Sequence, residues 1–487
     1  MAMKTKLSLA IFLFFLLALF SSLAMARKGR EVKDPELETC KHQCRQQHQY
    51  TESDIELCTE KCDKYHQMKK EREREIEEEI RRKKEHEIKR SSHHHEEEEE
   101  EEEGENPYVF EDQHFDTTVE TEGGRVRVLK KFSKLSKFLQ GIENFRLAII
   151  EAEPHTFMPP RHLDAEAILF NMKGRGIIGL VVEDKTERLN LESGDIVRIQ
   201  PGTPFYIVNR DENEKLLLAV FHTPISTPGN YEEFFGPGGR NPESVLTAFS
   251  WEVLQAALKG PRKELESLFD QQNEGGIFKI PREQVRAMAP KKSIWPFGGK
   301  SNPFNLFSTS PIFANQYGRL LEVGPDNDKS GLQGLNLMLT FANITKRSMT
   351  TVYYNTHATK IAVVKDGEGH FEMSCPHVSD SKSKRGRVSY HRISGNLKPG
   401  MVFVVPAGHP FVTISSKRNN LQIICFEVNA TGNKKLTFAG KNNIVRALDH
   451  TAKGLSFNYP PEKVDEIFNR DEQFFFPFFE EPARADA

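Results

Sequence analysis

Two residues of metal-ligating type lie two positions apart in the C-terminal half of the chain. Cys375 and His377 are separated by one proline, Pro376. On a β-strand, side chains two positions apart point to the same face, about 6 to 7 Å apart along the chain. A thiolate and an imidazole suit copper, with zinc as the second choice. A single cysteine on a strand is, however, often a small core residue, and a Cys-x-His pair also arises by chance.

An internal repeat supplies a third ligand. Residues 194–205 read GDIVRIQPGTPF and residues 400–411 read GMVFVVPAGHPF, with Gly, Gly, Pro and Phe in register. His409 of the second copy stands where the first copy has Thr203, at a strand start expected to face the same cavity as Cys375 and His377. The three residues form a candidate copper site, and an open position on the metal would meet a small anion or oxygen species.

The repeat also predicts the fold class. A second matching pair, residues 167–182 and 360–375, lies about 20 residues upstream of the first. Both copies consist of short apolar or alternating stretches separated by turns that contain glycine. Such segments suit a small antiparallel barrel or jelly roll, so the chain is predicted to be mainly β, with tandem barrels over residues 105–285 and 286–487.

Each predicted barrel ends in a helical stretch. The first has helical spacing over residues 242–258 and 261–272, and the second over 443–450 and 461–469. Appendages that are apolar on one face and lie outside a barrel tend to pack on a neighbouring subunit, which predicts a homo-oligomer held together by helical arms. The phenylalanine-rich run 474–479 is expected to cover an intersubunit groove.

The N-terminal region reads as a series of processing and linker segments. Two lysines precede an apolar run over residues 7–20, the order found in a cleaved secretory signal, predicted here over residues 1–26. The run is too short to cross a bilayer, so no membrane span is expected in the mature form. Residues 64–104 are almost entirely charged, end in eight glutamates and predict a solvated helix or disordered linker.

Four cysteines lie within residues 27–63, namely Cys40, Cys44, Cys58 and Cys62. Two Cys-x-x-x-Cys pairs predict two short helices stapled by two disulfides, for which the cross-helix pairings are geometrically best among three connectivities. A zinc site is the alternative, although secretion favours disulfides. The hairpin is either a removable propeptide or a defensive peptide. Cys425 is expected to be a buried free thiol.

Composition excludes several classes of function. The 487 residues carry a formal charge of −3 and 28% charged residues, which argues against a nucleic-acid binder. No acid/base pair is recognisable beside the candidate copper site, so no catalytic residue is assigned and no enzyme is expected.

The double repeat, the paired cysteines with their Glu-rich tail, and the segment Asn-Pro-Tyr-Val-Phe at residues 106–110 together resemble the vicilins, the 7S globulin seed-storage family of bicupins. This resemblance implies a trimer of double cupins that passes through the secretory pathway to protein storage vacuoles and is hydrolysed at germination. It also implies that the arm before the first barrel lies against the second, which makes Tyr108 a candidate fourth ligand. Some vicilins resemble this chain in the Cys-Pro-His pattern and bind copper.

The first barrel departs from the cupin metal motif. It keeps His162 and Glu166 there, a poor ligand set, and the repeat register places Tyr354 and Asn355 opposite Arg161 and His162. Two glycosylation sequons begin at Asn343 and Asn429. The predicted function is storage, and the alternatives are a metal-dependent, redox-active cupin and a defence protein that releases its N-terminal hairpin.

Overall fold

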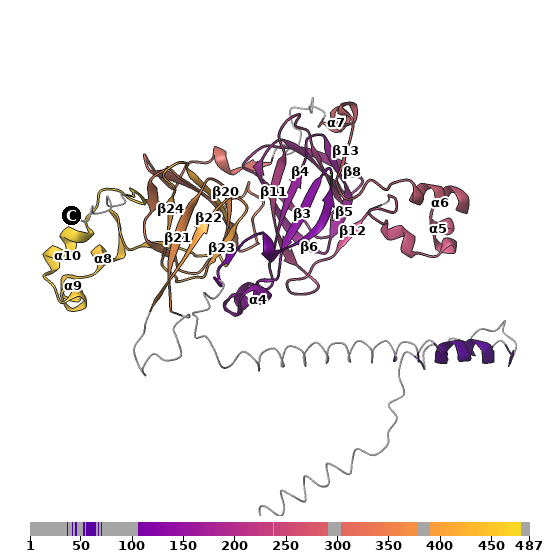
Figure 1. The fold of residues 1–487 in the computed structure, drawn as a ribbon, viewed down its shortest axis with the longest axis horizontal. Coiled ribbons are helices and arrows are strands. Elements are labelled where there is room, and N and C mark those ends of the chain that lie inside the picture. The colour runs from indigo at the N-terminus through magenta and orange to yellow at the C-terminus, as the bar shows by residue number, and fades with distance from the viewer. Residues whose placement is uncertain are drawn as a thin grey trace, which may run out of the picture. The chain divides into compact units, whose positions relative to one another are not determined.

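The computed structural model describes residues 106–236, 238–290, 303–376 and 390–478, together with scattered positions between 37 and 70. The chain divides into two compact units, residues 1–104 and 105–487. Antiparallel strands in the second unit form two adjacent barrels (Figure 1).

The first barrel consists of two sheets with apolar residues between them, including Leu169, Val197 and Ile207. The larger sheet has the order β14-β9-β6-β11-β4-β3-β2. Its strands in chain order are β2 (Phe115–Thr121), β3 (Gly124–Leu129), β4 (Arg146–Ala152), β6 (Ala165–Lys173), β9 (Asp195–Ile199), β11 (Leu216–Pro224) and β14 (Phe304–Asn305). The other sheet has the order β12-β5-β10-β7-β8, and β13 also pairs with β5. Its strands are β5 (Thr156–Leu163), β7 (Gly176–Val182), β8 (Lys185–Leu191), β10 (Phe205–Asn209), β12 (Glu233–Phe235) and β13 (Phe278–Lys279).

The second barrel repeats this plan. One sheet has the order β1-β23-β20-β25-β17-β16-β15. Its strands are β1 (Val109–Phe110), β15 (Phe313–Asn315), β16 (Gly318–Val323), β17 (Leu337–Ile344), β20 (Thr359–Asp366), β23 (Val402–Val405) and β25 (Leu421–Val428). The other sheet follows β22-β21-β24-β18-β27, with β19 paired to β24 and β26. Its strands are β18 (Ser348–Thr350), β19 (Tyr353–Asn355), β21 (Gly369–Cys375), β22 (His391–Leu397), β24 (Phe411–Ser415), β26 (Lys435–Thr437) and β27 (Phe475–Pro477). The predicted tandem of two jelly-roll barrels is confirmed.

The strands between the two barrels are apolar on both faces. Strand β25 is buried at nearly every position, because one face lines its own barrel and the other meets the neighbouring barrel. At this junction Phe221 of β11 stacks on Phe426 of β25, with ring centroids 5.0 Å apart. Strand β8, at the far edge of its sheet in the first barrel, is exposed at its first three residues and half-buried at the next three.

The two barrels exchange short strands. β1 precedes the first barrel in sequence but pairs with β23 of the second, where Phe110 lies opposite Val402. β14 precedes the second barrel but pairs with β9 of the first, where Phe304 lies opposite Ile196. Each barrel therefore completes one sheet edge with the chain segment that leads into the other barrel.

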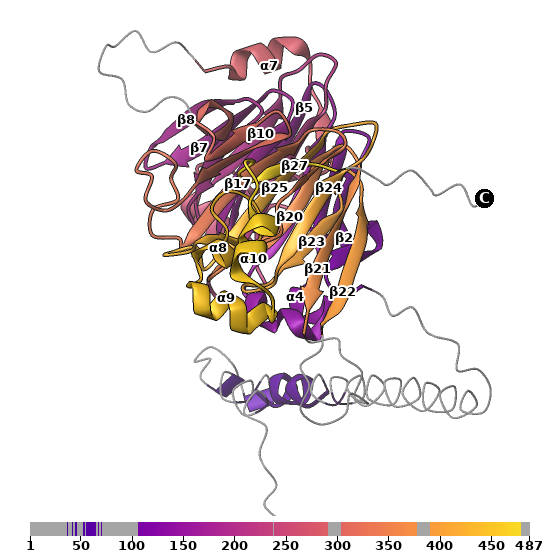
Figure 2. The same cartoon turned by 90° about the vertical axis from the view of Figure 1, so that its left-hand side faces the viewer.

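Helices project from opposite ends of the body (Figure 1). The first arm contains α5 (Trp251–Ala257) and α6 (Arg262–Asp270), and the second contains α8 (Ile444–Ala447), α9 (His450–Phe457) and α10 (Pro461–Phe468). Figure 2 shows the second arm gathered at one end of the body. The Ser250 and Asp449 side chains accept hydrogen bonds from the backbone at the starts of α5 and α9. Two further short helices are α4 (Phe132–Leu135) and α7 (Arg282–Met288).

Two expectations differ from the structure. The phenylalanine run does not cover an intersubunit groove, because Phe474, Phe475 and Phe476 are buried in the chain's own second barrel, where β27 pairs with β18. Helix α9 was not expected from helical spacing. The predicted signal peptide 1–26 lies outside the described residues, as does the predicted linker 64–104 except at Lys64, Gln67 and Lys70.

Candidate functional site

The exchanged strand β1 brings Tyr108 to the second barrel. The backbone N–H of Val404, in β23, donates to the carbonyl oxygen of Tyr108 at 2.9 Å. Cys375 is the last residue of β21, and both side chains are fully buried. The Tyr108 hydroxyl lies 3.6 Å from the Cys375 sulfur. The structure thus brings together two members of the predicted metal site that are 267 positions apart in sequence.

His409 lies beside Tyr108. It follows β23 in a turn, is 8% exposed, and its ring centroid lies 6.5 Å from that of Tyr108. Its Nδ1 lies 3.1 Å from the carbonyl oxygen of Ala407. Because a carbonyl oxygen only accepts hydrogen bonds, Nδ1 is the donor in this contact, and Nε2 would carry the lone pair in the neutral ring. A backbone carbonyl that fixes the tautomer in this way is a common support for a metal-binding histidine.

The donors at this point fit a soft metal ion. Tyr108, Cys375 and His409 supply a phenol, a thiol and an imidazole, which suit copper or zinc. Burial raises the pKa of Tyr108, and its contact with Cys375 raises it further, so the phenol is protonated at neutral pH. His377 lies outside the described residues. In the part of the chain that the structure describes, no three His, Cys, Asp or Glu side chains come together as metal ligands.

The first barrel carries different residues on the strand that corresponds to Tyr353 and Tyr354 of the second. The alignment of the two copies predicted from the repeat was wrong by one residue at this point. Phe205 and Phe411 are equivalent in the repeat, and they pair with Arg161 and Tyr353, respectively. Arg161 therefore corresponds to Tyr353 and not to Tyr354. The ring of His162 stacks on Phe234 with centroids 5.0 Å apart.

Glu166 is also engaged elsewhere. Its two carboxylate oxygens accept hydrogen bonds from the Arg198 guanidinium at 2.8 and 2.9 Å. The two residues of the cupin motif that the first barrel retains are thus held by a ring contact and an ion pair.

Inside the first barrel lies a buried polar cluster that sequence reasoning missed. The Arg161 guanidinium contacts the Glu233 carboxylate at 3.3 Å and donates to the carbonyl oxygen of Gly276 at 3.2 Å. His222 stacks on Tyr231 with centroids 4.3 Å apart. Burial lowers the pKa of His222 to about 3, with a further contribution from the charge of Arg146, so this imidazole is neutral. The cavity beside the cluster measures about 20 Å³, room for one water molecule.

The second barrel has a buried ionic cluster at the corresponding place. Glu427 is fully buried and lies 2.5 Å from the Lys360 ammonium and 3.6 Å from that of Lys435. The side chains of Thr340 and Asn355 also donate to its carboxylate, at 2.8 and 3.1 Å. Burial alone would raise the pKa of Glu427, but the two lysine charges and these hydrogen bonds outweigh it and bring the pKa to about 2. The sequence feature that could have revealed this cluster is a charged residue beside the apolar run of each strand, Lys360 in β20 and Glu427 in β25.

The remaining predicted sites are placed as follows. Cys44 and Cys58 form a disulfide, one of the predicted cross-helix bridges; Cys62 is also disulfide-bonded, and Cys40 lies outside the described residues. Cys425 is buried and free, as expected.

The two sequons differ in access. Asn343 is half-buried in β17, which pairs on both sides with β16 and β25. Asn429 is exposed just beyond the end of β25, with a positive φ of 61°. Asn429 is therefore the accessible acceptor of the two.

Comparison with known proteins identifies the family. The Cupin family model matches residues 109–261 and 304–465. A vicilin of Juglans regia is 51% identical to this chain, over 98% of this chain and 97% of that protein. The chain belongs to the vicilins, the 7S globulin branch of the bicupins. The crystal structure of the vicilin from Corylus avellana has 53% sequence identity and a TM-score of 0.72, and the match covers 77% of this chain and all of that one.

A second relative carries a different name. The "Sucrose-binding protein" of Glycine max is 62% identical over 525 aligned residues, which cover 100% of both chains. The vicilin relatives support storage as the function of this chain and a non-enzymatic role. Within the described residues, no helix has the length and apolar character needed to span a membrane.

Proposed function

We propose that this vicilin is a seed storage globulin that enters the secretory pathway through the segment 1–26, is deposited in protein storage vacuoles and is hydrolysed at germination. The observation that carries the proposal is the sequence similarity to a vicilin over 98% of the chain, together with the bicupin fold. Mass spectrometry of seed extracts through germination tests it, with an antibody to the second barrel used to locate the protein. Accumulation outside vacuoles, or an intact chain after germination, would contradict the proposal.

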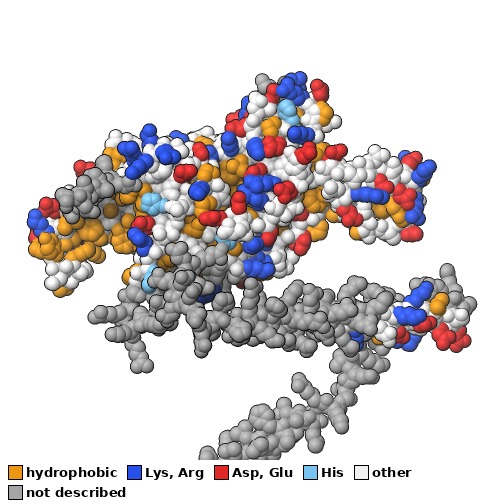
Figure 3. All heavy atoms as spheres, in the orientation of Figure 1, with side chains coloured by type: hydrophobic (Ala, Val, Ile, Leu, Met, Phe, Trp, Pro, Cys, Tyr) orange, Lys and Arg blue, Asp and Glu red, His pale blue; other side chains and the backbone are white. Residues whose placement is uncertain are grey.

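The storage form is a homotrimer joined through the helical arms. Of fourteen exposed large hydrophobic side chains in the described residues, eight lie on the two arms: Phe249, Val253, Leu268, Leu448, Leu455, Phe457, Tyr459 and Ile467. Figure 3 shows hydrophobic side chains gathered at the end of the body formed by the second arm. Because the arms project from opposite ends, contact between unlike arms is head to tail, and such contacts close into a ring when the rotation allows it.

Light scattering after size-exclusion chromatography tests the role of the arms. Leu455→Asp and Ile467→Asp place a charge on the exposed face of the second arm, and each should convert trimers into monomers. Ile225→Asp is the matched control, since Ile225 is 64% exposed and lies on the first barrel. Trimers that persist in both arm variants would refute assembly through this face.

The second barrel of this globulin holds a copper ion, with zinc as the second choice. Tyr108, Cys375, His377 and His409 are the ligands, and the support is the approach of Tyr108 to Cys375 together with the tautomer of His409. Copper bound there would supply one-electron chemistry with a small oxygen species, or bind a small anion. The chain's own residues bury the site and hold the lone pair of His409 on Nε2.

Metal analysis of protein purified without chelator tests this site. We expect about one copper per subunit in the wild type and none in Cys375→Ser. Cys425→Ser is a matched control, because it removes the other buried free thiol and should leave the copper content unchanged. Equal metal content in the wild type and Cys375→Ser would overturn the assignment.

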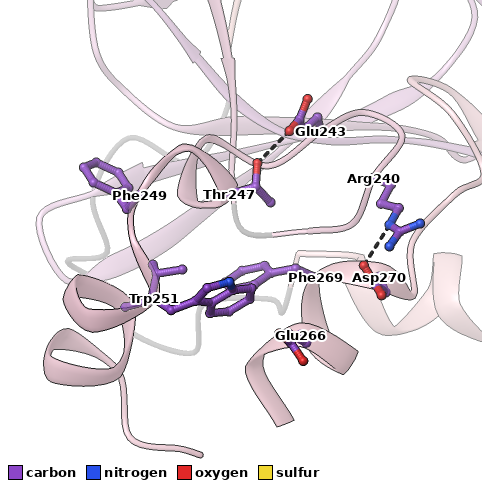
Figure 4. A pocket seen from close by; sticks show the side chains of 9 residues that line it. Arg240, Glu243, Thr247, Phe249, Trp251, Glu266, Phe269 and Asp270 are labelled. Atoms are coloured by element: carbon purple, nitrogen blue, oxygen red, sulfur yellow. Dashed lines mark hydrogen bonds and ion pairs between the residues drawn. The ribbon is translucent and has the colours of Figure 1, made fainter. Parts of the chain in front are cut away.

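Saccharide binding is a second candidate function, favoured by the name of the Glycine max relative and by a pocket in the first arm. The pocket measures about 570 Å³ and includes three aromatic side chains, Trp251, Phe249 and Phe269. In Figure 4 the indole of Trp251 lies centrally, and the ion pair Arg240–Asp270 borders the pocket. Ring faces pack against the apolar C–H face of a sugar, and carboxylates accept hydrogen bonds from its hydroxyls.

Calorimetric titration of the purified trimer with sucrose tests the candidate pocket. Trp251→Ala should abolish binding, whereas Lys263→Ala, at an exposed residue of α6 that does not line the pocket, should leave it unchanged. Equal sucrose binding in the wild type and Trp251→Ala would exclude this pocket, and no binding in the wild type would exclude the function for this chain.

Defence through a released hairpin remains an alternative role for residues 27–63. The Cys44–Cys58 bridge supports it, since a stapled peptide persists after cleavage of its flanking chain. Peptide mass mapping of mature seed protein separates the possibilities. A free, disulfide-linked peptide supports release, and an intact N-terminus contradicts it.

A further inference from the structure

A polar cleft lies where the two barrels meet, and its lining does not include Tyr108, Cys375 or His409. Its volume is about 690 Å³. The first barrel contributes residues of β3 and β4 and of the turn between β10 and β11, and the second contributes the end of β20 and the turn before β23. The cleft therefore belongs to neither barrel alone. Its basic side chains are Arg125, Arg127, Lys173, Lys215 and Lys365.

Positive charge exceeds negative charge in this cleft, although the whole chain is slightly acidic. Three carboxylates line it, from Asp112, Glu151 and Glu214. One oxygen of Glu151 serves two guanidinium groups, those of Arg125 at 2.8 Å and Arg127 at 2.9 Å. Concave surfaces with an excess of one sign concentrate the electrostatic potential and attract the opposite charge.

Two cationic groups in the cleft keep unused hydrogen-bonding or charge capacity, although the Arg127 guanidinium already pairs with Asp112 and Glu151. The Arg127 side chain is 7% exposed, and its Nε makes no hydrogen bond within the described residues. The Lys365 ammonium donates to the amide oxygen of Gln422 at 2.9 Å and forms no ion pair among the described residues, whereas Lys173 pairs with Glu214 at 3.2 Å. Burial lowers the pKa of Lys365 and the charge of Lys173 adds to this effect, although the charges of Asp366 and Glu214 act in the opposite direction. An anion in the cleft would offer an acceptor to the Nε–H of Arg127 and a negative charge to the Lys365 ammonium.

We propose that this cleft binds a small polyphosphate anion that bridges the two barrels. Guanidinium groups bind phosphate through paired N–H donors, and lysine ammonium groups bind it as point charges. The first barrel supplies Arg125, Arg127 and Lys173, and the second supplies Lys365. The cleft lacks an aromatic side chain among its described lining residues, which distinguishes it from the arm pocket and disfavours a sugar without phosphate.

Calorimetric titration of the full-length trimer with inorganic tripolyphosphate tests the proposal. We expect one binding event per subunit that weakens between low salt and about 0.15 M salt, since part of the attraction is screened. Lys365→Met and Lys173→Met should each weaken binding about tenfold or more, because a hydrogen bond to a charged group contributes more than a neutral one. Lys185→Met is the matched control, because Lys185 is exposed on β8 and does not line the cleft.

Circular dichroism and light scattering first establish that each variant is folded and trimeric. Bound tripolyphosphate should also raise the melting temperature of the wild type more than that of Lys365→Met. Three outcomes would overturn the proposal: no binding by the wild type at low salt, equal binding by the wild type and Lys365→Met, or citrate binding as tight as that of tripolyphosphate.

Discussion

Replacement of Glu427 by glutamine tests whether the ionic cluster inside the second barrel is charged. Glu427→Gln keeps the size of the side chain but removes its negative charge and replaces one acceptor oxygen by an NH₂ donor. The Lys360 ammonium, which is also fully buried, then loses the carboxylate that lies 2.5 Å away. Breaking a buried ion pair on one side leaves an uncompensated charge and destabilises a protein by about 3 to 5 kcal/mol.

The pKa of Glu427 gives an independent magnitude. The pKa falls from an ordinary 4.5 to about 2 in the folded protein. At about 1.4 kcal/mol per unit, the charged carboxylate contributes about 3 kcal/mol to the free energy of unfolding. Because the folded pKa is the lower one, this contribution is complete above pH ~4.5 and is lost as the pH falls towards 2.

Thermal melts followed by circular dichroism at matched protein concentration measure the effect. At neutral pH, Glu427→Gln should melt about 5 to 10 °C below the wild type, and the difference should shrink as the pH falls from 4.5 to 2. Glu372→Gln is the control, since Glu372 forms an exposed 3.7 Å pair with Arg392 and should change the melting temperature little.

A double replacement separates charge from packing. Lys360→Met combined with Glu427→Leu removes both charges and should recover much of the stability that Glu427→Gln loses. If Glu427→Gln melts with the wild type and keeps its pH dependence, the pair is not charged in the folded protein and the reasoning fails.

Three further predictions follow from the fold. Asn429→Gln should remove a glycan detected by intact-mass measurement of plant-expressed protein, whereas Asn343→Gln should not; glycan loss from the second variant would contradict the assignment by burial. Phe110→Ala should destabilise the chain by about 3 kcal/mol and speed hydrogen exchange in β23, because Phe110 is buried there. Phe304→Ala, at a half-buried residue, should cost less and speed exchange in β9. Faster exchange only in the first barrel for Phe110→Ala, or only in the second for Phe304→Ala, would contradict the strand exchange. Burial raises the pKa of Tyr231, so this phenol should stay protonated at pH 11 in an ultraviolet titration of the folded protein, and a normal titration there would contradict its burial.

The sequence predicts the barrels because local patterns determine them. Glycine-containing turns and apolar stretches recur in both copies, and the structure places strands there. The register of the metal motif could not be fixed in this way. β10 and β5 shift register between Phe205 and Ile207, and the second barrel divides the counterpart of β5 into β18 and β19. Residues at the same spacing in the two copies therefore do not always occupy equivalent positions on the two sheets.

The buried ionic cluster is invisible to pattern analysis for a different reason. Lys360 and Glu427 are 67 positions apart, and each borders a run of apolar residues in its strand. Their contact depends on the pairing of β20 with β25, which sets them opposite one another. Tyr108 likewise reaches Cys375 only through the strand exchange, so family resemblance predicted it and spacing did not. Helix α9 begins at the capping residue Asp449 but contains a glycine and a buried lysine, which obscure its apolar face.

The reciprocal strand exchange bears on the ancestry of the fold. Phe110 lies opposite Val402 and Phe304 opposite Ile196, and Val402 and Ile196 are equivalent positions of the repeat. The two exchanged strands are therefore the same element in two copies. A single-barrel precursor with this element would have donated it to a second molecule and received one in return, as domain-swapped dimers do. Fusion of two such genes would give a tandem chain with the connectivity of the swapped dimer. Neither half of that chain would then contain, by itself, every strand of its own barrel.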